Sequence, residues 1–315
     1  MEDKQNLRLF SQGAFYNLWG LAFVLIFIFL FQIVFSYLSL AISALVYGQS
    51  LAEVRQLINA PDGSALSINI YRLSNFIAFT GSMLLPALLF AFINKIPASQ
   101  IAGWNKPVRL SQILQALAMV VLSIVCVNWL TDWFRHIHWP QTLHYLAEKL
   151  DSGRQDTMGT LLDMQTPGEL MLCLFLAGLL PAFTEELLFR GILQRIFFRI
   201  TGKAGTSIFL QATVFALLHL SFYELPAIFL MGIMFGIVTY ATGTTWYSVI
   251  MHFLFNATSI VLHYFSLRHF EKTGITGAYD DFILPGFYAA FCAIPLFWLL
   301  LNWLRIRAKN NTSHE

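Results

Sequence analysis

The chain has 315 residues, of which 57% are hydrophobic and only 11% are charged. Soluble domains carry about 25% charged residues, so this composition excludes an ordinary soluble protein and indicates a chain that lies largely in lipid. The formal net charge of +2 is too small to favour nucleic acid as a partner.

Eight apolar stretches are close to, or longer than, the about 20 residues that cross a bilayer as a helix. They lie at residues 18–46, 73–93, 112–130, 168–198, 204–221, 225–241, 245–266 and 286–304. The first is longer than the apolar part of a cleaved signal peptide, about 7–15 residues, and is expected to remain as a span. The polar segment 131–167 is predicted to include a surface helix at "TLHYLAEKL". We therefore predict an all-α polytopic membrane protein with about eight transmembrane helices around a polar intramembrane cavity.

The distribution of basic residues predicts the orientation, because short cytoplasmic loops carry an excess of Lys and Arg. On alternate sides of the predicted spans, the connections that share a side with Lys4 and Arg8 carry eleven basic residues, against seven on the opposite side. Both termini are therefore expected on the cytoplasmic side of the cell membrane.

The fourth apolar stretch contains adjacent carboxylates, Glu185 and Glu186, near its middle. Charged residues at the centre of a bilayer cost several kcal/mol and usually face a bundle interior or a water-filled cavity. Glu186 and Arg190 are four residues apart, so they lie on one helix face and can pair. Glu185 points about 100° away around the helix and needs a proton or another partner.

Two later stretches supply candidate partners for Glu185. Phe215 and His219 lie one turn apart in the fifth stretch, and His252 and Asn256 lie one turn apart in the seventh. A single His in an apolar helix is usually a core residue, but three polar spans together predict one shared site. Water held between a carboxylate and an imidazole is a nucleophile for amide hydrolysis, and His or Asn can donate to the oxyanion that forms.

Other nucleophiles and metals are weaker candidates in this sequence. Ser248 has no base adjacent in sequence and is expected to serve helix packing. The zinc-protease pattern HExxH is absent, and no cofactor is expected. If zinc does bind, Glu185, His219 and His252 are the expected ligands.

The motifs "EELLFR", "FALLH" and "HFLFN", in this order, resemble the EExxxR, FxxxH and HxxxN motifs of the CAAX protease and bacteriocin-processing family of intramembrane glutamate proteases. The connecting segment is also similar, with Gly232 and Gly236 as a small-xxx-small helix contact. The resemblance covers about residues 169–265, a third of the chain. It implies an all-helical membrane fold around a water-accessible site.

The resemblance also implies roles for the motif residues. Glu185 would be the general base, His219 its partner, and His252 and Asn256 the groups that bind the carbonyl and stabilise the oxyanion. Glu186 and Arg190, with Phe215, would support the site. The substrate would be a peptide or a membrane-anchored protein, cleaved without a metal.

The resemblance divides the chain into three parts. These are an N-terminal transmembrane region at 1–167, a catalytic core at 168–266, and a final span with a cytoplasmic tail at 267–315.

Two functions of other classes remain open from the sequence. Intramembrane Glu and His also form proton or ion paths in transporters, although no internal repeat with paired broken helices is evident. A membrane immunity or binding factor could keep the motifs without using them. Loss of a cellular phenotype in Glu185→Gln favours the protease or the transporter over the binding factor, and a shortened peptide product separates the first two.

Overall fold

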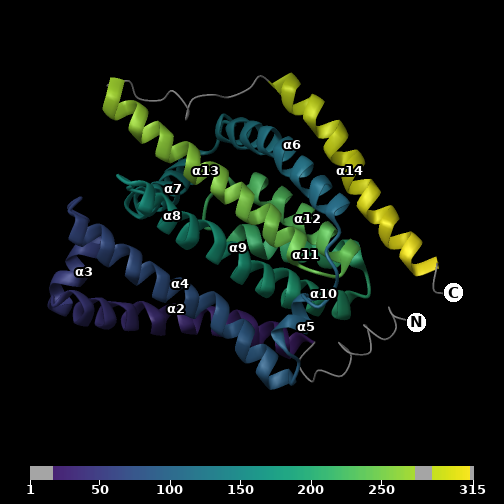
Figure 1. Ribbon diagram of the computed structural model, residues 1–315, viewed down its shortest axis with the longest axis horizontal. Helices are drawn as coiled ribbons and strands as arrows, with labels where there is room; N and C mark the ends of the chain where they lie inside the picture. Colours follow the sequence, from purple (N-terminus) through teal and green to yellow (C-terminus); the bar gives the residue numbers. More distant parts are fainter. Residues whose placement is uncertain (1–16, 274–285, 313–315) are drawn as a thin grey trace.

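The computed structural model describes residues 17–273 and 286–312, and within these ranges every regular element is a helix. Figure 1 shows their arrangement. In chain order they are α2 (Leu18–Tyr47), α3 (Leu51–Asn59), α4 (Ala65–Asn94), α5 (Ala98–Ala102), α6 (Leu110–Arg135), α7 (Gln141–Leu161), α8 (Pro167–Cys173), η1 (Leu174–Leu179), α9 (Leu180–Glu185), η2 (Glu186–Leu193), α10 (Gln194–Thr201), α11 (Ala204–Leu218), α12 (Leu225–Thr242), α13 (Trp246–Thr273) and α14 (Gly286–Thr312). The segments η1 and η2 are π-helical, so residues 167–201 form one continuous helical run.

Among the described residues, seven helices are long and apolar enough to cross a membrane, when the run from 167 to 201 is counted as one. The predicted all-α, polytopic membrane fold is therefore confirmed. The fifth expected span is corrected, because α11 has only 15 residues. At about 1.5 Å per residue it is roughly 22 Å long, which is short of the hydrocarbon core of about 30 Å.

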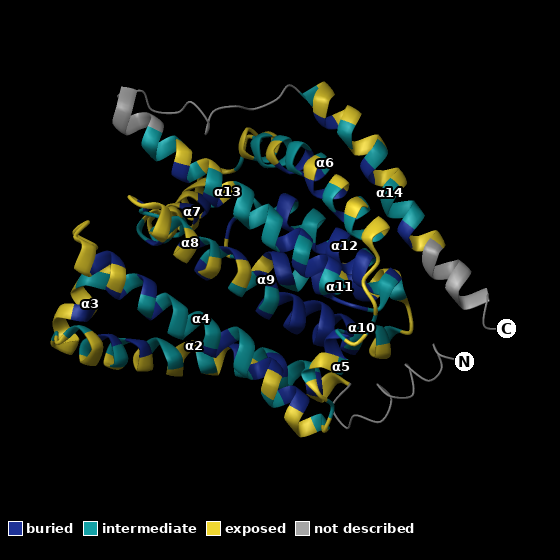
Figure 2. Ribbon diagram, in the orientation of Figure 1, coloured by how far each residue is buried: buried dark blue, intermediate teal, exposed yellow. Residues whose placement is uncertain are grey.

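The burial pattern fits a bundle in lipid. Buried residues concentrate in η2 and α12, in the middle of the bundle, whereas the outer faces of α2 and α14 are exposed (Figure 2). Those faces carry large apolar side chains such as Phe29, Ile33 and Phe291. Contact of these apolar faces with water would be unfavourable, whereas contact with lipid tails is not.

The run that carries the two glutamates starts at a well-defined point. Thr166 caps α8 and forms a capping box with Glu169, and Pro167 occupies the first helical position. Arg72 of α4 is nearly fully buried and pairs with Glu169 at 3.3 Å. Its guanidinium also donates to the carbonyl oxygens of Leu161 and Asp163, at 3.2 and 2.7 Å. Because Arg72 binds both the end of α7 and the start of α8, it sets where the run begins relative to α4.

Helix α7 contains the predicted surface helix but is longer, with 21 residues. It lies at the same end of the bundle as α3 and the start of α8 (Figure 1). Most of its residues are exposed, whereas Ala147, Asp151 and Leu161 are buried.

The first described turn of α2 and the last turn of α14 lie at the same end of the bundle (Figure 1). Residues 1–16 and 313–315, which include Lys4 and Arg8, are outside the described residues. The cytoplasmic location of both termini therefore stays a prediction, and so does the three-part division of the chain.

Candidate active site

The two carboxylates lie where the regular α9 ends and the π-helical η2 begins, between Glu185 and Glu186. Segments of π-helix are rare and often mark functional sites. The pattern of apolar residues across 168–198 predicts a regular helix and gives no sign of this change. Both glutamates are buried, Glu185 at 7% and Glu186 at 0% exposure.

Pro181 helps to explain how a neighbouring helix joins this site. Proline has no backbone N–H, so it cannot donate to the carbonyl of Ala177 four residues earlier. The side-chain amide of Asn256, on α13, donates to that carbonyl oxygen at 3.2 Å. The amide has a second hydrogen, which is left for another acceptor. Asn256 is therefore tied to the run that carries the glutamates.

Glu186 and Arg190 form the ion pair that their spacing predicts, with Nη1 and Oε1 2.7 Å apart and both side chains fully buried. The Arg190 guanidinium carbon lies 4.2 Å from the ring centre of Phe215 and 5.1 Å from that of Phe235. Nδ1 of His252 lies 3.0 Å from the same Glu186 oxygen. The pair therefore holds an imidazole as well as neutralising a buried charge.

Glu185 faces two imidazoles. Its Oε2 lies 3.9 Å from Nε2 of His219 and 3.9 Å from Nε2 of His252. These distances are too long for hydrogen bonds, but one water oxygen can lie about 2.8 Å from both atoms of either pair. Glu185 Oε2 is buried and has no hydrogen-bond partner among the described residues. A buried carboxylate oxygen of this kind requires a hydrogen-bond donor, and water supplies one.

The tautomers of both imidazoles follow from their other contacts. Nδ1 of His219 lies 2.7 Å from the carbonyl oxygen of Phe215, which only accepts hydrogen bonds, so Nδ1 carries a proton. Nδ1 of His252 likewise donates to the carboxylate of Glu186. The neutral forms of both rings therefore present an unprotonated Nε2 to Glu185, and the protonated forms present an N–H donor.

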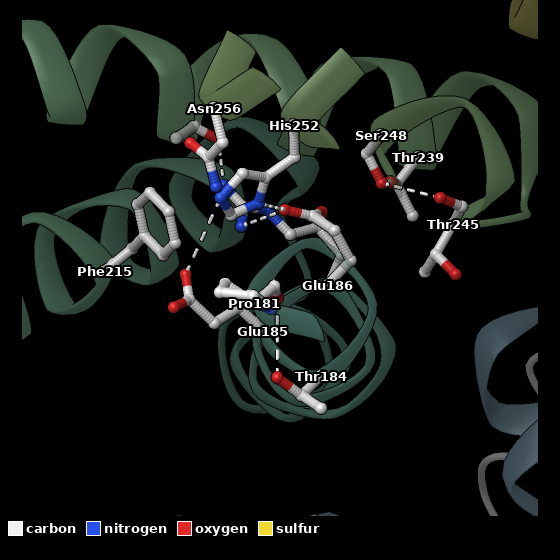
Figure 3. A network of polar contacts seen from close by, with 12 residues as sticks. Pro181, Thr184, Glu185, Glu186, Phe215, Thr239, Thr245, Ser248, His252 and Asn256 are labelled. Carbon is white, nitrogen blue, oxygen red and sulfur yellow. Dashed lines mark hydrogen bonds and ion pairs between the residues drawn. The ribbon is translucent and has the colours of Figure 1, made fainter. Parts of the chain in front are cut away.

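Figure 3 shows His252 and Asn256 extending from α13 towards the two glutamates, with Phe215 beside them. The structure thus brings together all seven candidates from the sequence, which are Glu185, Glu186, Arg190, Phe215, His219, His252 and Asn256. Among Glu185, His219 and His252, the side chain of His219 is the most exposed. The exposed fraction of the side chain is 26% for His219, 10% for Glu185 and 8% for His252. The group is therefore most accessible beside His219, where the short α11 ends.

Two buried glutamines belong to the same polar layer but were missed in the sequence analysis. Gln211 donates to the carbonyl oxygen of Gly232 at 2.9 Å, and Gln194 donates to that of Gly236 at 3.0 Å. A signal was present, because Gln194 follows Arg190 by four residues and Gln211 precedes Phe215 by four. Both therefore lie on the site faces of their helices.

Gly232 and Gly236 form a close contact between α12 and α11, as their spacing predicts. A Cβ atom at Gly232 would lie 2.9 Å from the Cβ of Ala212, and one at Gly236 would lie 2.9 Å from Ile208. The absence of these side chains lets the glutamines reach the glycine carbonyls.

We predict that Gly232→Ala destabilises the protein by about 1–3 kcal/mol, the usual cost of overpacking a tight contact. The measurement is the thermal unfolding midpoint in detergent. Gly205→Ala on α11 is the matched control, because a Cβ there meets nothing within 4 Å. Equal midpoints for the two variants would contradict the close contact.

Ser248 lies apart from this group. It is fully buried, accepts a hydrogen bond from Thr239 at 3.0 Å and donates to the carbonyl oxygen of Thr245 at 2.9 Å (Figure 3). The contact with Thr239 joins α12 to α13, which agrees with the packing role expected from the sequence, and the bond to Thr245 lies at the start of α13.

The described side chains show whether a metal site is already formed. In the described part of the chain, no group of three or more His, Cys, Asp or Glu side chains has the arrangement of a metal site. In Glu185, His219 and His252, the ligands expected for zinc, the carboxylate Oε2 lies 3.9 Å from each Nε2.

Comparison with protein families gives one match. Residues 167–258 match the model described as "Type II CAAX prenyl endopeptidase Rce1-like". The matched segment begins at the first residue of α8 and includes all seven candidate residues. Comparisons with curated proteins and with solved structures found no match. The predicted resemblance to the CAAX protease family is confirmed for this segment.

Proposed function

Because residues 167–258 carry an Rce1-like domain of the CAAX protease family, we propose that the protein is an intramembrane endopeptidase that hydrolyses a peptide bond with a water activated by Glu185. The protein is a multi-pass membrane protein, and the proteases of this family act on membrane-anchored peptides. The observation that carries the proposal is the position of Glu185 Oε2, 3.9 Å from Nε2 of both His219 and His252.

The proposed reaction starts with a water molecule between Glu185 and His219. Glu185 accepts a proton from the water as the water oxygen bonds to the peptide carbonyl carbon, and the carbonyl oxygen becomes an oxyanion. The proton then passes from Glu185 to the amide nitrogen, and the C–N bond breaks. The products are a new carboxyl terminus and a free amine, so no other reactant is needed.

The oxyanion is stabilised by donors on α13. His252 donates through Nε2 when its ring is protonated, and the Glu186 carboxylate at its Nδ1 fixes the orientation of the ring. Asn256 donates through the hydrogen that is not bonded to Ala177. Glu186 and Arg190 hold His252 in place, and Phe215 holds His219 through its carbonyl.

The proposed substrate is a peptide segment of a membrane-anchored protein, and the name of the matched family points to prenylated C-terminal segments. Glu185 lies near the middle of the 35-residue run 167–201. The scissile bond must therefore enter the bilayer to reach Glu185. We place both termini on the cytoplasmic side of the cell membrane, and no metal takes part in the proposed reaction.

The test uses purified protein in detergent with a peptide library that includes C-terminally prenylated peptides, with and without a strong zinc chelator. We expect mass spectrometry to find new C-termini, with equal yield when the chelator is present. Absence of cleavage across the library would contradict the proposed function. Chelator-sensitive cleavage that zinc restores would instead assign Glu185, His219 and His252 as ligands of a metal that activates the water.

A further inference from the structure

We propose that Asp151, on α7, is a positioning residue that holds His219 in place opposite Glu185. The inference rests on the proposed function for its catalytic consequence, but not for its geometry. Asp151 lies outside the segment that matches the protease family.

Asp151 is bonded to the chain directly after His219. Asp151 is 8% exposed, and its carboxylate accepts three hydrogen bonds from the connection between α11 and α12. Oδ1 accepts from Ser221 Oγ at 2.9 Å and from the backbone N–H of Phe222 at 3.1 Å. Oδ2 accepts from the backbone N–H of Tyr223 at 3.2 Å. A carboxylate makes stronger hydrogen bonds than a neutral acceptor, so this short connection is firmly held.

The connection needs such an anchor because its path is strained. Leu220, between His219 and Ser221, has φ of 51°, in the left-handed region that is unfavourable for a residue other than glycine. Its side chain is 65% exposed, so packing of that side chain does not hold the conformation. The bonds to Asp151 begin at the next residue and offset the strain.

Other contacts from the same region strengthen the anchor. Arg154 of α7 forms an ion pair with Glu224, and His144 of α7 bonds to the hydroxyl of Tyr223 at 2.7 Å. Phe222 packs against the rings of Phe134 and Trp139, with ring centres 5.5 and 5.0 Å away. These contacts all hold residues 222–224, and Asp151 alone among them reaches back to Ser221.

The position of α7 itself is fixed at its end. Arg72 of α4 donates to the carbonyl of Leu161, the last residue of α7, at 3.2 Å. The same Arg72 pairs with Glu169 at the start of the run that carries Glu185. Arg72 therefore contacts both the helical run that carries Glu185 and the helix α7 that carries Asp151. Through these two contacts it sets the positions of Glu185 and His219 relative to each other.

The consequence concerns the distance between Glu185 and His219. The imidazole is held from one side by the carbonyl of Phe215 and from the other by the path of the chain after it. If Asp151 loses its negative charge, the connection is released and Nε2 of His219 moves away from Glu185. A misplacement of about 1 Å at a catalytic group can cost about 100-fold in rate.

The test compares Asp151→Asn with Asp156→Asn, a matched change at an exposed position of the same helix. In the wild-type protein, three donors bond to the two carboxylate oxygens of Asp151. Asparagine replaces one of these oxygens with an NH₂ group, which does not accept a hydrogen bond. We expect kcat to fall roughly 10–100-fold with little change in KM, whereas Asp156→Asn keeps wild-type values. Ser221→Ala, which removes one of the three bonds, should give a smaller loss of kcat and covers the case that Asp151→Asn does not fold.

An independent readout separates positioning from a general loss of stability. In protein labelled at histidine, NMR signals of the His219 ring, assigned with His219→Gln, should shift in Asp151→Asn or Ser221→Ala, while those of His252 stay. Unmoved His219 signals would overturn the proposal, whatever happens to kcat. If the wild-type protein cleaves no peptide, the proposed function fails, and the His219 signals still decide whether Asp151 positions the ring.

Discussion

Glu185→Gln is expected to lower the rate of peptide cleavage by about 10²–10⁴-fold, the usual contribution of a general base. Glutamine has nearly the size of glutamate and can still accept a hydrogen bond, but it does not take a proton from water. The protein should still insert and fold, since an uncharged side chain at this buried position removes an electrostatic cost. The measurement is kcat and KM on a cleaved peptide, with the thermal unfolding midpoint recorded for each variant.

The matched control is Glu53→Gln. Glu53 forms the capping box at the start of α3 with Ser50, and glutamine serves the same capping role. This variant should keep wild-type kcat and stability. Full activity in Glu185→Gln would refute the assigned base, and equal losses in both variants would show that the effect is not specific to the site.

Arg190→Leu is expected to destabilise the protein by about 3–5 kcal/mol, the typical cost of removing one partner of a buried ion pair. Glu186 would remain as a fully buried carboxylate without its cation, next to Glu185. The guanidinium also lies over the rings of Phe215 and Phe235, so its loss weakens the packing of α11 and α12 as well. Thermal unfolding in detergent measures the effect.

Two comparisons give this prediction a control. Arg199→Leu removes an arginine at an exposed position of α10 and should change the unfolding midpoint much less. The double variant Glu186→Leu with Arg190→Leu removes both charges and should recover part of the lost stability. It should not recover cleavage, because His252 loses the acceptor at its Nδ1. A double variant with full activity would contradict the role given to Glu186.

Much of the fold follows from the sequence because the relevant signals are local. An apolar run of about 20 residues favours a membrane-spanning helix wherever it occurs in a chain. The positions of the long helices were therefore predictable. The same holds for the pairing of Glu186 with Arg190, because residues four apart on a helix lie side by side. The four-residue spacings of Phe215 with His219 and of His252 with Asn256 were readable for the same reason.

Other features depend on how separate helices pack. The spacing of residues showed which face of α13 carries His252 and Asn256, but the bond from Asn256 to Ala177 joins residues 79 positions apart. The π-helical turns of η1 and η2 have no counterpart in the apolar pattern, because the pattern of apolar residues continues through them. Nothing in the sequence indicated that α11 ends at Leu218, since the mostly apolar stretch continues up to Leu220.

Local sequence patterns are enough to predict the membrane class, seven of the eight expected spans and the polar residues that carry the family resemblance. The packing of the helices is what brings Nε2 of His219 and of His252 to face Glu185 Oε2, and what brings Asp151 to the connection after His219. The physical reason is that helix formation and lipid burial depend on neighbours within a few turns. The distance between groups on different helices depends on side-chain packing and on connections such as residues 219–224, whose path is set by contacts with a distant helix.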